Sequence, residues 1–255
     1  MTVDQVFIIK KLQNLDEMLV AYSAVTRMPF AICDDESFND QVWIFTDQDK
    51  LKTFAEKYKE EKKLILPVKV QKKDASMFYM NLFAMGINEV VFCDGDQENK
   101  IELTKIVRMP DVDALPENRK PILNPQLQLS AAYFLQELRK PGVEPDREAL
   151  KDLEEEMSAN LARSTYLMPV DVEKDEEGKE IFSDTGELVK HYRGKEVQNR
   201  LIQVRFDQLS RYMIKDVQGY VLNPEGINLI LRTQQIELLN SYYNGKKETQ
   251  KPEEN

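Results

Sequence analysis

The sequence predicts an α/β (α+β) protein of two tandem repeat domains, each with a mixed sheet of about five strands covered by helices. Three observations support this prediction. The chain has 255 residues, enough for two domains of about 150 residues or fewer. Short apolar runs typical of strands alternate with amphipathic stretches typical of helices. The same order of elements occurs on both sides of residues 109–125, which we expect to be a linker because they contain prolines at 110, 116, 121 and 125.

The first predicted domain covers residues 1–108. It opens with an amphipathic helix whose apolar stripe consists of Leu12, Leu15, Leu19 and Tyr22. The motif Thr46-Asp47-Gln48-Asp49 resembles a capping box, so we expect a second helix to start there with the Thr46 hydroxyl as its cap. The other expected elements are strands at 29–33, 42–45 and 64–70, a helix at 74–85, and closing strands at 89–93 and 101–107.

The second predicted domain covers residues 126–243, with an extra helix at its start, 125–139. The helix after it has an apolar stripe of Leu150, Leu153, Met157 and Leu161. Two motifs match the first domain: Met28-Pro29-Phe30 with Met168-Pro169-Val170, and Ile44-Phe45-Thr46-Asp47 with Ile181-Phe182-Ser183-Asp184. The remaining expected elements are strands at 201–206, 220–222 and 227–232, a helix starting at Asp207 and a helix at 233–243. Residues 244–255 are expected to be a disordered tail.

This order of elements resembles the N-terminal domain of SseB-type proteins, a family named after a bacterial protein associated with enhanced serine sensitivity. The motifs that carry the resemblance are the Met-Pro strand, the Ile-Phe-Thr/Ser-Asp helix start and Asn223-Pro224-Glu225-Gly226 before the closing strand. It covers residues 10–108 and 145–243. The first copy departs from the family pattern, because Cys93-Asp94-Gly95 stands where Asn-Pro-Gly is usual. The resemblance implies the fold and a bacterial origin, and the family brings no established activity.

Composition excludes several classes of function. With 35 basic and 45 acidic residues the net charge is −10, which repels nucleic acid and anionic membranes. The lysine-rich segment 57–73 lacks arginine and is expected to be a solvated face. The longest nearly apolar stretch, 77–87, is about half a membrane span. With no apparent signal peptide, the protein is expected to be cytoplasmic and to bind neither nucleic acid nor membrane.

No metal or cofactor is predicted. Two cysteines, Cys33 and Cys93, and one histidine, His191, cannot supply the four ligands of a structural zinc site. The nine glycines are too far apart for either glycine-rich phosphate-binding motif. The segment Glu173-Lys174-Asp175-Glu176-Glu177-Gly178 resembles half a calcium loop, but it lacks the closing glutamate and is better interpreted as a hairpin tip.

The polar candidates have structural interpretations that we favour over catalytic ones. His191 takes the place of Phe54 in the repeat alignment, so we expect it to pack rather than to act as a base. Thr46-Asp47 and Ser183-Asp184 are expected to cap helices. Those two helix N-termini leave open the binding of an anion. Both cysteines are expected to be small core residues.

The segment 77–85 is apolar nearly all the way round a helix, so it must be covered on both sides. Two alternatives follow. Either the second domain or residues 6–9 lie over it, which we favour, or Phe78 and Met80 belong to an exposed patch that binds a partner.

The sequence therefore predicts a non-catalytic, cytoplasmic protein-interaction module with an unidentified protein partner; a homo-oligomer is left open. The alternative is a small-molecule or amino-acid sensor that holds an anionic ligand near the Thr46 and Ser183 helix starts. No catalytic, cofactor-binding or metal-ligating residue is predicted. The candidate ligand or interaction residues are Phe45, Thr46, Asp47, Phe182, Ser183, Asp184, Asn223, Pro224, Phe78 and Met80.

Overall fold

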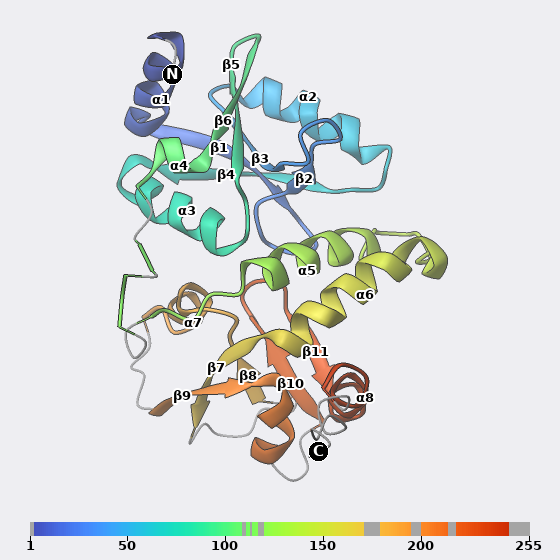
Figure 1. Cartoon of the computed structure of the whole chain (residues 1–255). Coiled ribbons are helices and arrows are strands. Elements are labelled where there is room, and N and C mark those ends of the chain that lie inside the picture. Colours follow the sequence, from blue (N-terminus) through green and yellow to red (C-terminus); the bar gives the residue numbers. More distant parts are fainter. Residues whose placement is uncertain are drawn as a thin grey trace, which may run out of the picture.

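The structure is a computed structural model that describes residues 3–108, 111–112, 114–116, 120–170, 179–194, 200–213 and 218–244. The fold is mixed α/β, as predicted (Figure 1). The expected hairpin tip at 173–178 and nearly all of the expected tail lie outside the described residues. Within the described residues, no helix is long and apolar enough to cross a bilayer.

The first half of the chain forms one sheet. Its elements are α1 (Val3–Asn14), β1 (Glu17–Ser23), β2 (Ala31–Cys33), β3 (Asp40–Phe45), α2 (Gln48–Lys59), β4 (Ile65–Gln71), α3 (Lys72–Ala84), β5 (Glu89–Asp94), β6 (Gln97–Glu102) and α4 (Leu103–Ile106). The strand order is β4-β1-β3-β5-β6, with β2 paired to β3. Only β3 and β5 run parallel; the other pairs in this sheet are antiparallel.

The second half repeats much of this pairing. Its elements are α5 (Pro125–Leu138), α6 (Arg147–Arg163), β7 (Thr165–Val170), β8 (Lys179–Ile181), α7 (Thr185–His191), β9 (Arg200–Arg205), the 3-10 helix η2 (Phe206–Tyr212), β10 (Gly219–Leu222), β11 (Leu229–Arg232) and α8 (Thr233–Tyr243). β7 and β9 are antiparallel, β8 and β10 parallel, and β10 and β11 antiparallel. A single bridge between Leu167 and Phe182 joins β7 to β8.

Strand pairing gives a correspondence between the halves. The pairs β1–β3, β1–β4, β3–β5 and β5–β6 of the first half correspond to the pairs β7–β8, β7–β9, β8–β10 and β10–β11 of the second. Leu19 stands opposite Phe45 in the first half, and Leu167 stands opposite Phe182 in the second. This agreement is expected of tandem copies. The repeat itself stays a prediction until the two backbones are superposed, with Phe45 over Phe182 and Phe54 over His191.

The expected first helix is wrong in its second part. Leu19 and Tyr22 lie on β1, a strand between β3 and β4. Such a strand is buried on both faces: Met18 and Val20 belong to one apolar cluster, and Leu19 belongs to the other. Continuous burial produces an apolar run that also satisfies helical spacing.

The Met-Pro match between the halves is also wrong. Met168 and Pro169 lie inside β7, whereas Met28 and Pro29 follow β1, where Pro29 forms a bridge to Tyr22. The Ile-Phe match agrees with the strand register. Phe45 is the last residue of β3, and Phe182 comes directly after β8.

Residues 101–107 are not one strand. They divide between the end of β6 and the short helix α4. Leu103 and Ile106 are three residues apart, so a helical turn places both side chains on the buried face. β6 instead starts at Gln97, after a turn in which Gly95 has a φ of 61°.

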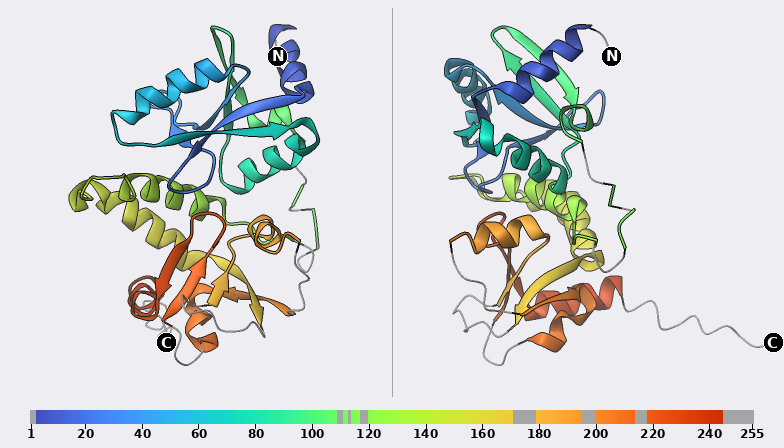
Figure 2. Two further views of the ribbon diagram at one scale, coloured as in Figure 1. Left: turned by 180° about the vertical axis from the view of Figure 1, so that it is seen from behind. Right: turned by 90° about the vertical axis from the view of Figure 1, so that its left-hand side faces the viewer.

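α5 connects the two halves through a shared core. Both views in Figure 2 show α5 and α6 between the strands of the first half and those of the second. One apolar cluster includes Leu82 of α3, Leu135 of α5 and Leu222 of β10. Gln136 bonds to both backbone groups of Ala31 (Nε2 to O, 3.1 Å; Oε1 from N, 3.3 Å). α5 therefore packs against both halves of the chain. The domain boundary predicted at residue 125 stays a prediction.

The apolar segment 77–85 lies within and just after α3 and packs mainly inside the chain. Phe78, Tyr79, Leu82 and Met85 are buried, and Met80 is half-buried. α3 contacts α1 and α5, as the favoured alternative requires. The helix does have a solvent face, because Met77 is 64% exposed.

Candidate functional site

Ser183, Asp184 and Asn223 form a buried polar network with α5. The Asn223 side chain bonds to Ser183 twice: its Oδ1 accepts from the Ser183 backbone N–H (2.9 Å), and its Nδ2 donates to Ser183 Oγ (2.7 Å). Ser183 Oγ donates to Asp184 Oδ2 (2.7 Å), which also accepts from Gln128 Nε2. Asn124 Nδ2 donates to the Ser183 carbonyl (2.6 Å). Each of these groups is satisfied within the fold.

The helices α2 and α7 are each capped by an aspartate rather than by the hydroxyl of the residue before it. Asp47 accepts from the backbone N–H of Asp49 (2.6 Å) and Lys50 (3.3 Å) at the start of α2. Asp184 Oδ1 accepts from the Glu187 N–H (3.0 Å) at the start of α7. The expectation that Thr46 and Ser183 supply the caps is therefore wrong by one residue, because their hydroxyls bond to Asp94 and Asp184 instead.

These caps leave little for an anionic ligand. Each helix N-terminus already faces a carboxylate, which satisfies the backbone donors that an anion would need. The first half lies beside the start of α7, because a Cβ on Gly186 would lie 3.4 Å from Asn81 Oδ1 of α3. The two helix starts therefore have the geometry of structural caps.

Glu187 is the least satisfied member of this region. Its Oε1 lies 3.5 Å from Lys190 Nζ, while Oε2 is buried without a hydrogen-bond partner among the described residues. A Cβ on Gly226 would come within 2.5 Å of Oε2, so the absence of a side chain there makes room for the carboxylate. Burial raises the pKa of Glu187, and the neighbouring Asp184 charge adds to the rise against the effect of Lys190. Burial, with the charge of Glu187, raises the pKa of Tyr22 on β1 to about 12.

His191 packs as expected. Its ring lies 5.5 Å from that of Phe182 and 4.9 Å from that of Tyr192. Phe54, which takes the place of His191 in the predicted repeat alignment, lies 5.3 Å from Phe45. His191 Nε2 also lies 3.2 Å from Glu180 Oε2, and Glu180 stands on β8 where Trp43 stands on β3. The first half thus has a Trp–Phe stack of 4.8 Å where the second has a His–Glu pair.

Several predicted interaction residues lie inside the protein. Phe45, Phe182, Asn223 and Phe78 are buried, whereas Met80 and Pro224 are half-buried. Thr46 and Asp47 are exposed. The structure brings Phe182, Ser183, Asp184 and Asn223 together in the second half. It places Phe78 in the shared core and leaves Met80 half-buried on the same helix, α3.

The cysteines do not form a reactive pair. Cys93 is buried, and burial raises the pKa of its thiol to about 12. Cys33 is exposed at the end of β2, so its assignment to the core is wrong. Partial desolvation of its thiol and the nearby charge of Asp40 raise the pKa of Cys33 as well. In the part of the chain that the structure describes, no group of three or more His, Cys, Asp or Glu side chains is placed to hold a metal ion.

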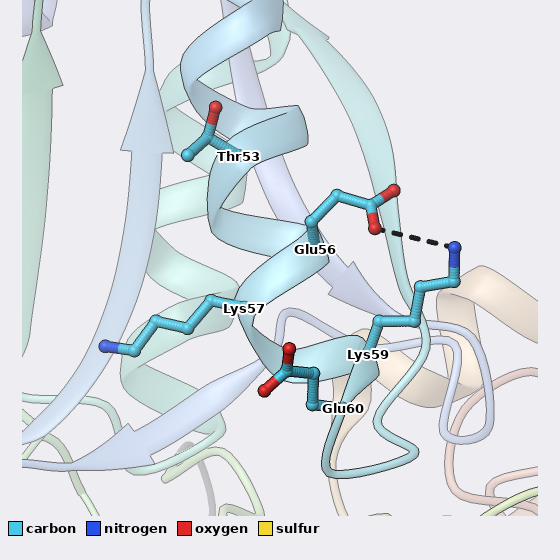
Figure 3. A pocket seen from close by; sticks show the side chains of 5 residues that line it. All are labelled: Thr53, Glu56, Lys57, Lys59 and Glu60. Atoms are coloured by element: carbon cyan, nitrogen blue, oxygen red, sulfur yellow. Dashed lines mark hydrogen bonds and ion pairs between the residues drawn. The ribbon is translucent and has the colours of Figure 1, made fainter.

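A shallow hollow lies on the outer side of α2 (Figure 3). Thr53, Glu56, Lys57, Lys59 and Glu60 line it. The carboxylate of Glu56 and the ammonium of Lys59 lie 3.5 Å apart. Opposite charges are mixed within one helix face, which agrees with the expected solvated lysine surface.

The turn between β2 and β3 holds a feature that the sequence interpretation missed. Phe38 is 76% exposed and has a φ of +56°. Asp34 braces the turn: its Oδ1 accepts from Ser37 N (2.9 Å), its backbone O accepts from Phe38 N (2.8 Å), and its Oδ2 lies 2.5 Å from Lys100 Nζ. The bond to Lys100 holds the pKa of Asp34 well below its usual range. The signal available in the sequence was a lone aromatic residue within Asp34-Asp35-Glu36-Ser37-Phe38-Asn39-Asp40.

Comparison with known proteins adds little to this geometry. No protein-family model matches the chain, and no curated protein matches it. Among solved structures, Tic22 from Plasmodium falciparum aligns over 94% of this chain and 99% of that chain, with 11% identity and a TM-score of 0.23. A TM-score this low carries no argument about fold or function. The resemblance to the SseB-type family stays a prediction.

Proposed function

We propose that the chain is a non-catalytic, cytoplasmic protein-interaction module that uses the turn around Phe38 as a contact point. The observation that carries this proposal is the combination of exposure and backbone strain at Phe38. A bulky residue with a positive φ is a genuine outlier. Because the aromatic ring is exposed in the free protein, no burial of apolar surface offsets this backbone strain. Such strain is characteristic of binding sites.

The turn is also held in place before any partner arrives. Asp34 fixes the backbone on one side of Phe38, and Asn39 Nδ2 donates to Glu89 Oε1 (3.2 Å) on the other. A rigid aromatic anchor loses little conformational freedom on binding. Asp35 and Glu36 are exposed beside it, so the complementary surface is an apolar pocket with a basic rim.

The alternative, a sensor of an anionic small molecule, has less support. Asp47 and Asp184 occupy the two helix starts where the anion would bind. The net charge of −10 also opposes the approach of anions, including nucleic acid and anionic membranes.

Phe38→Asn tests the proposal, because asparagine tolerates a positive φ better than phenylalanine. We expect the variant to melt no lower than the wild type and to lose its protein partner in an affinity purification with crosslinking from the native cytoplasm. Tyr242→Asn, which removes another exposed aromatic ring, is the matched control and should keep the partner. Retention of the same partner by Phe38→Asn would refute the role of the turn. A metabolite anion that raises the melting temperature would instead support the sensor.

A further inference from the structure

β9 is the outer strand of the second half, and its free edge can be identified from the strand pairing. In β7, Leu167 exchanges backbone hydrogen bonds with Phe182 (2.9 Å each way), so its N–H and C=O point toward β8. Its neighbours Tyr166 and Met168 therefore point toward β9, where they face Val204 and Ile202. It follows that Leu201, Gln203 and Arg205 direct their backbone groups away from β7.

β4 is the outer strand of the first half, and the strand pairing identifies its free edge too. The Ala21 carbonyl accepts from Phe30 N (2.8 Å), so Ala21 points away from β4 and its opposite residue, Pro67, points outward. Lys69 points outward too, two residues further on. Pro67 removes an outward donor, and Lys69 adds an exposed charged side chain, which lies 2.8 Å from Glu17 Oε1. Proline and lysine are both typical protections of a sheet edge against pairing.

The second half lacks both protections at the corresponding positions. Lys69 stands opposite Leu19, and Gln203 stands opposite the corresponding Leu167. Pro67 and Leu201 correspond in the same way, two residues earlier in their strands. Thus a leucine replaces the edge proline, and a neutral amide replaces the edge lysine.

The outward-facing residues of β9 are exposed, and the one charge among these three is paired within the chain. Leu201 is 41% exposed, and Gln203 and Arg205 are exposed. Arg205 forms two bonds to Asp207 of its own chain (Nε to Oδ1, 3.0 Å; Nη2 to Oδ2, 2.8 Å). Among the described residues, no strand other than β7 pairs with β9.

We propose that this edge pairs in antiparallel fashion with β9 of a second copy of the chain. With the two-fold axis at Gln203, that residue faces its own equivalent, and Leu201 of each copy faces Arg205 of the other. The outward backbone groups of Leu201 and Gln203 and the Arg205 carbonyl then find partners. The Arg205 N–H donates to Gln208 Oε1 (3.3 Å) within the chain, and it exchanges that bond for one to the Leu201 carbonyl of the other copy. The Leu201 side chain lies along the aliphatic stem of the arginine.

The choice of a second copy as the occupant rests on this symmetry. A two-fold interface requires one surface to be complementary to itself, and the edge of β9 meets that requirement without placing like charges opposite each other. Shifting the axis to Arg205 would set two arginines face to face, which is unfavourable in a cross-strand pair. The register centred on Gln203 avoids this contact.

The oligomeric state of the full chain tests the proposal. In sedimentation velocity from micromolar to millimolar concentration, the wild type should convert from monomer to dimer. The double variant L201P/Q203K copies the β4 edge onto β9 and should stay monomeric throughout. If the proline prevents folding, Q203K alone is the fallback, since it changes only an exposed side chain. Leu238→Lys, an exposed apolar position on α8, is the matched control and should dimerise as the wild type does.

Crosslinking tests the register. In a Cys33→Ser background, Gln203→Cys should give a disulfide-linked dimer on mild oxidation, and Arg205→Cys should give far less. The proposal is overturned if the wild type stays monomeric at millimolar concentration, if L201P/Q203K or Q203K dimerises like the wild type, or if Leu238→Lys abolishes the dimer. Stronger crosslinking at position 205 than at 203 overturns the register.

Discussion

Glu187 shows how one buried carboxyl group connects the two halves of the molecule. It belongs to α7, yet its charge adds to the effect of burial in raising the pKa of Tyr22 on β1. Its own pKa is raised above the ordinary value of 4.5, chiefly by burial. A raised carboxyl pKa stabilises the folded protein fully below the unfolded pKa. That contribution is lost as the pH rises through the folded pKa.

Glu187→Gln removes this ionisation and keeps the shape of the side chain. We expect the variant to have a higher melting temperature than the wild type at pH 7, where the wild type must bury a charge. Near pH 4 the two proteins should melt together, because the wild-type carboxyl is then protonated. Thermal melts across this pH range measure the difference, with Glu237→Gln, an exposed position on α8, as the control. A variant less stable than the wild type at pH 7 would contradict this account.

Within the helix α3, neighbouring side chains differ strongly in burial. Phe78 is 7% exposed and lies in the shared core, while its neighbour Met77 is 64% exposed. The sequence could not distinguish these faces, because apolar residues occur all around the helix. α3 packs against the adjacent strand β4 and also against α1 and α5, which lie far from it in the sequence.

Phe78→Ser and Met77→Ser therefore form a matched pair. Removing a buried phenylalanine side chain should lower the free energy of unfolding by about 3–5 kcal/mol. The exposed change should stay within about 0.5 kcal/mol. Urea unfolding followed by circular dichroism measures both. An unchanged unfolding curve for Phe78→Ser, together with reduced association, would show that this face is an interface.

Local signals in the sequence predicted some elements well. The helix α8 has the predicted bounds, 233–243, and α2 starts within two residues of the predicted point because its aspartate cap and apolar stripe are close together in the chain. β1 was mistaken for a helix because its burial comes from two neighbouring strands. The candidate site followed the same rule. The Ser183-Asp184 motif and the packing of His191 follow from neighbouring residues in the sequence, whereas the effect of Glu187 on the pKa of Tyr22 joins residues distant in sequence.

At the scale of the whole molecule, the two halves share one core rather than meeting at a thin boundary. The largest apolar cluster contains residues of both sheets and of α5. Polar bonds cross the same region: Tyr133 of α5 donates to Asp40 Oδ1 (2.6 Å), and Gln136 bonds to Ala31. Separate unfolding of either half would expose part of this core, so we expect the chain to unfold as one unit.

Arg139 is the residue best placed to test that coupling. Its guanidinium donates to the Val25 carbonyl in the first half (3.2 Å) and to the Ile227 and Asn228 carbonyls in the second (2.8 and 2.9 Å). Arg139→Met keeps much of the aliphatic stem but removes all three bonds, so the free energy of unfolding should fall by about 1.5–3 kcal/mol or more. Arg163→Met, at an exposed position, should have little effect. Calorimetry should give a single transition for both variants, at a lower temperature for Arg139→Met alone. Two separate transitions in the wild type would show instead that the halves fold independently and that α5 does not couple them.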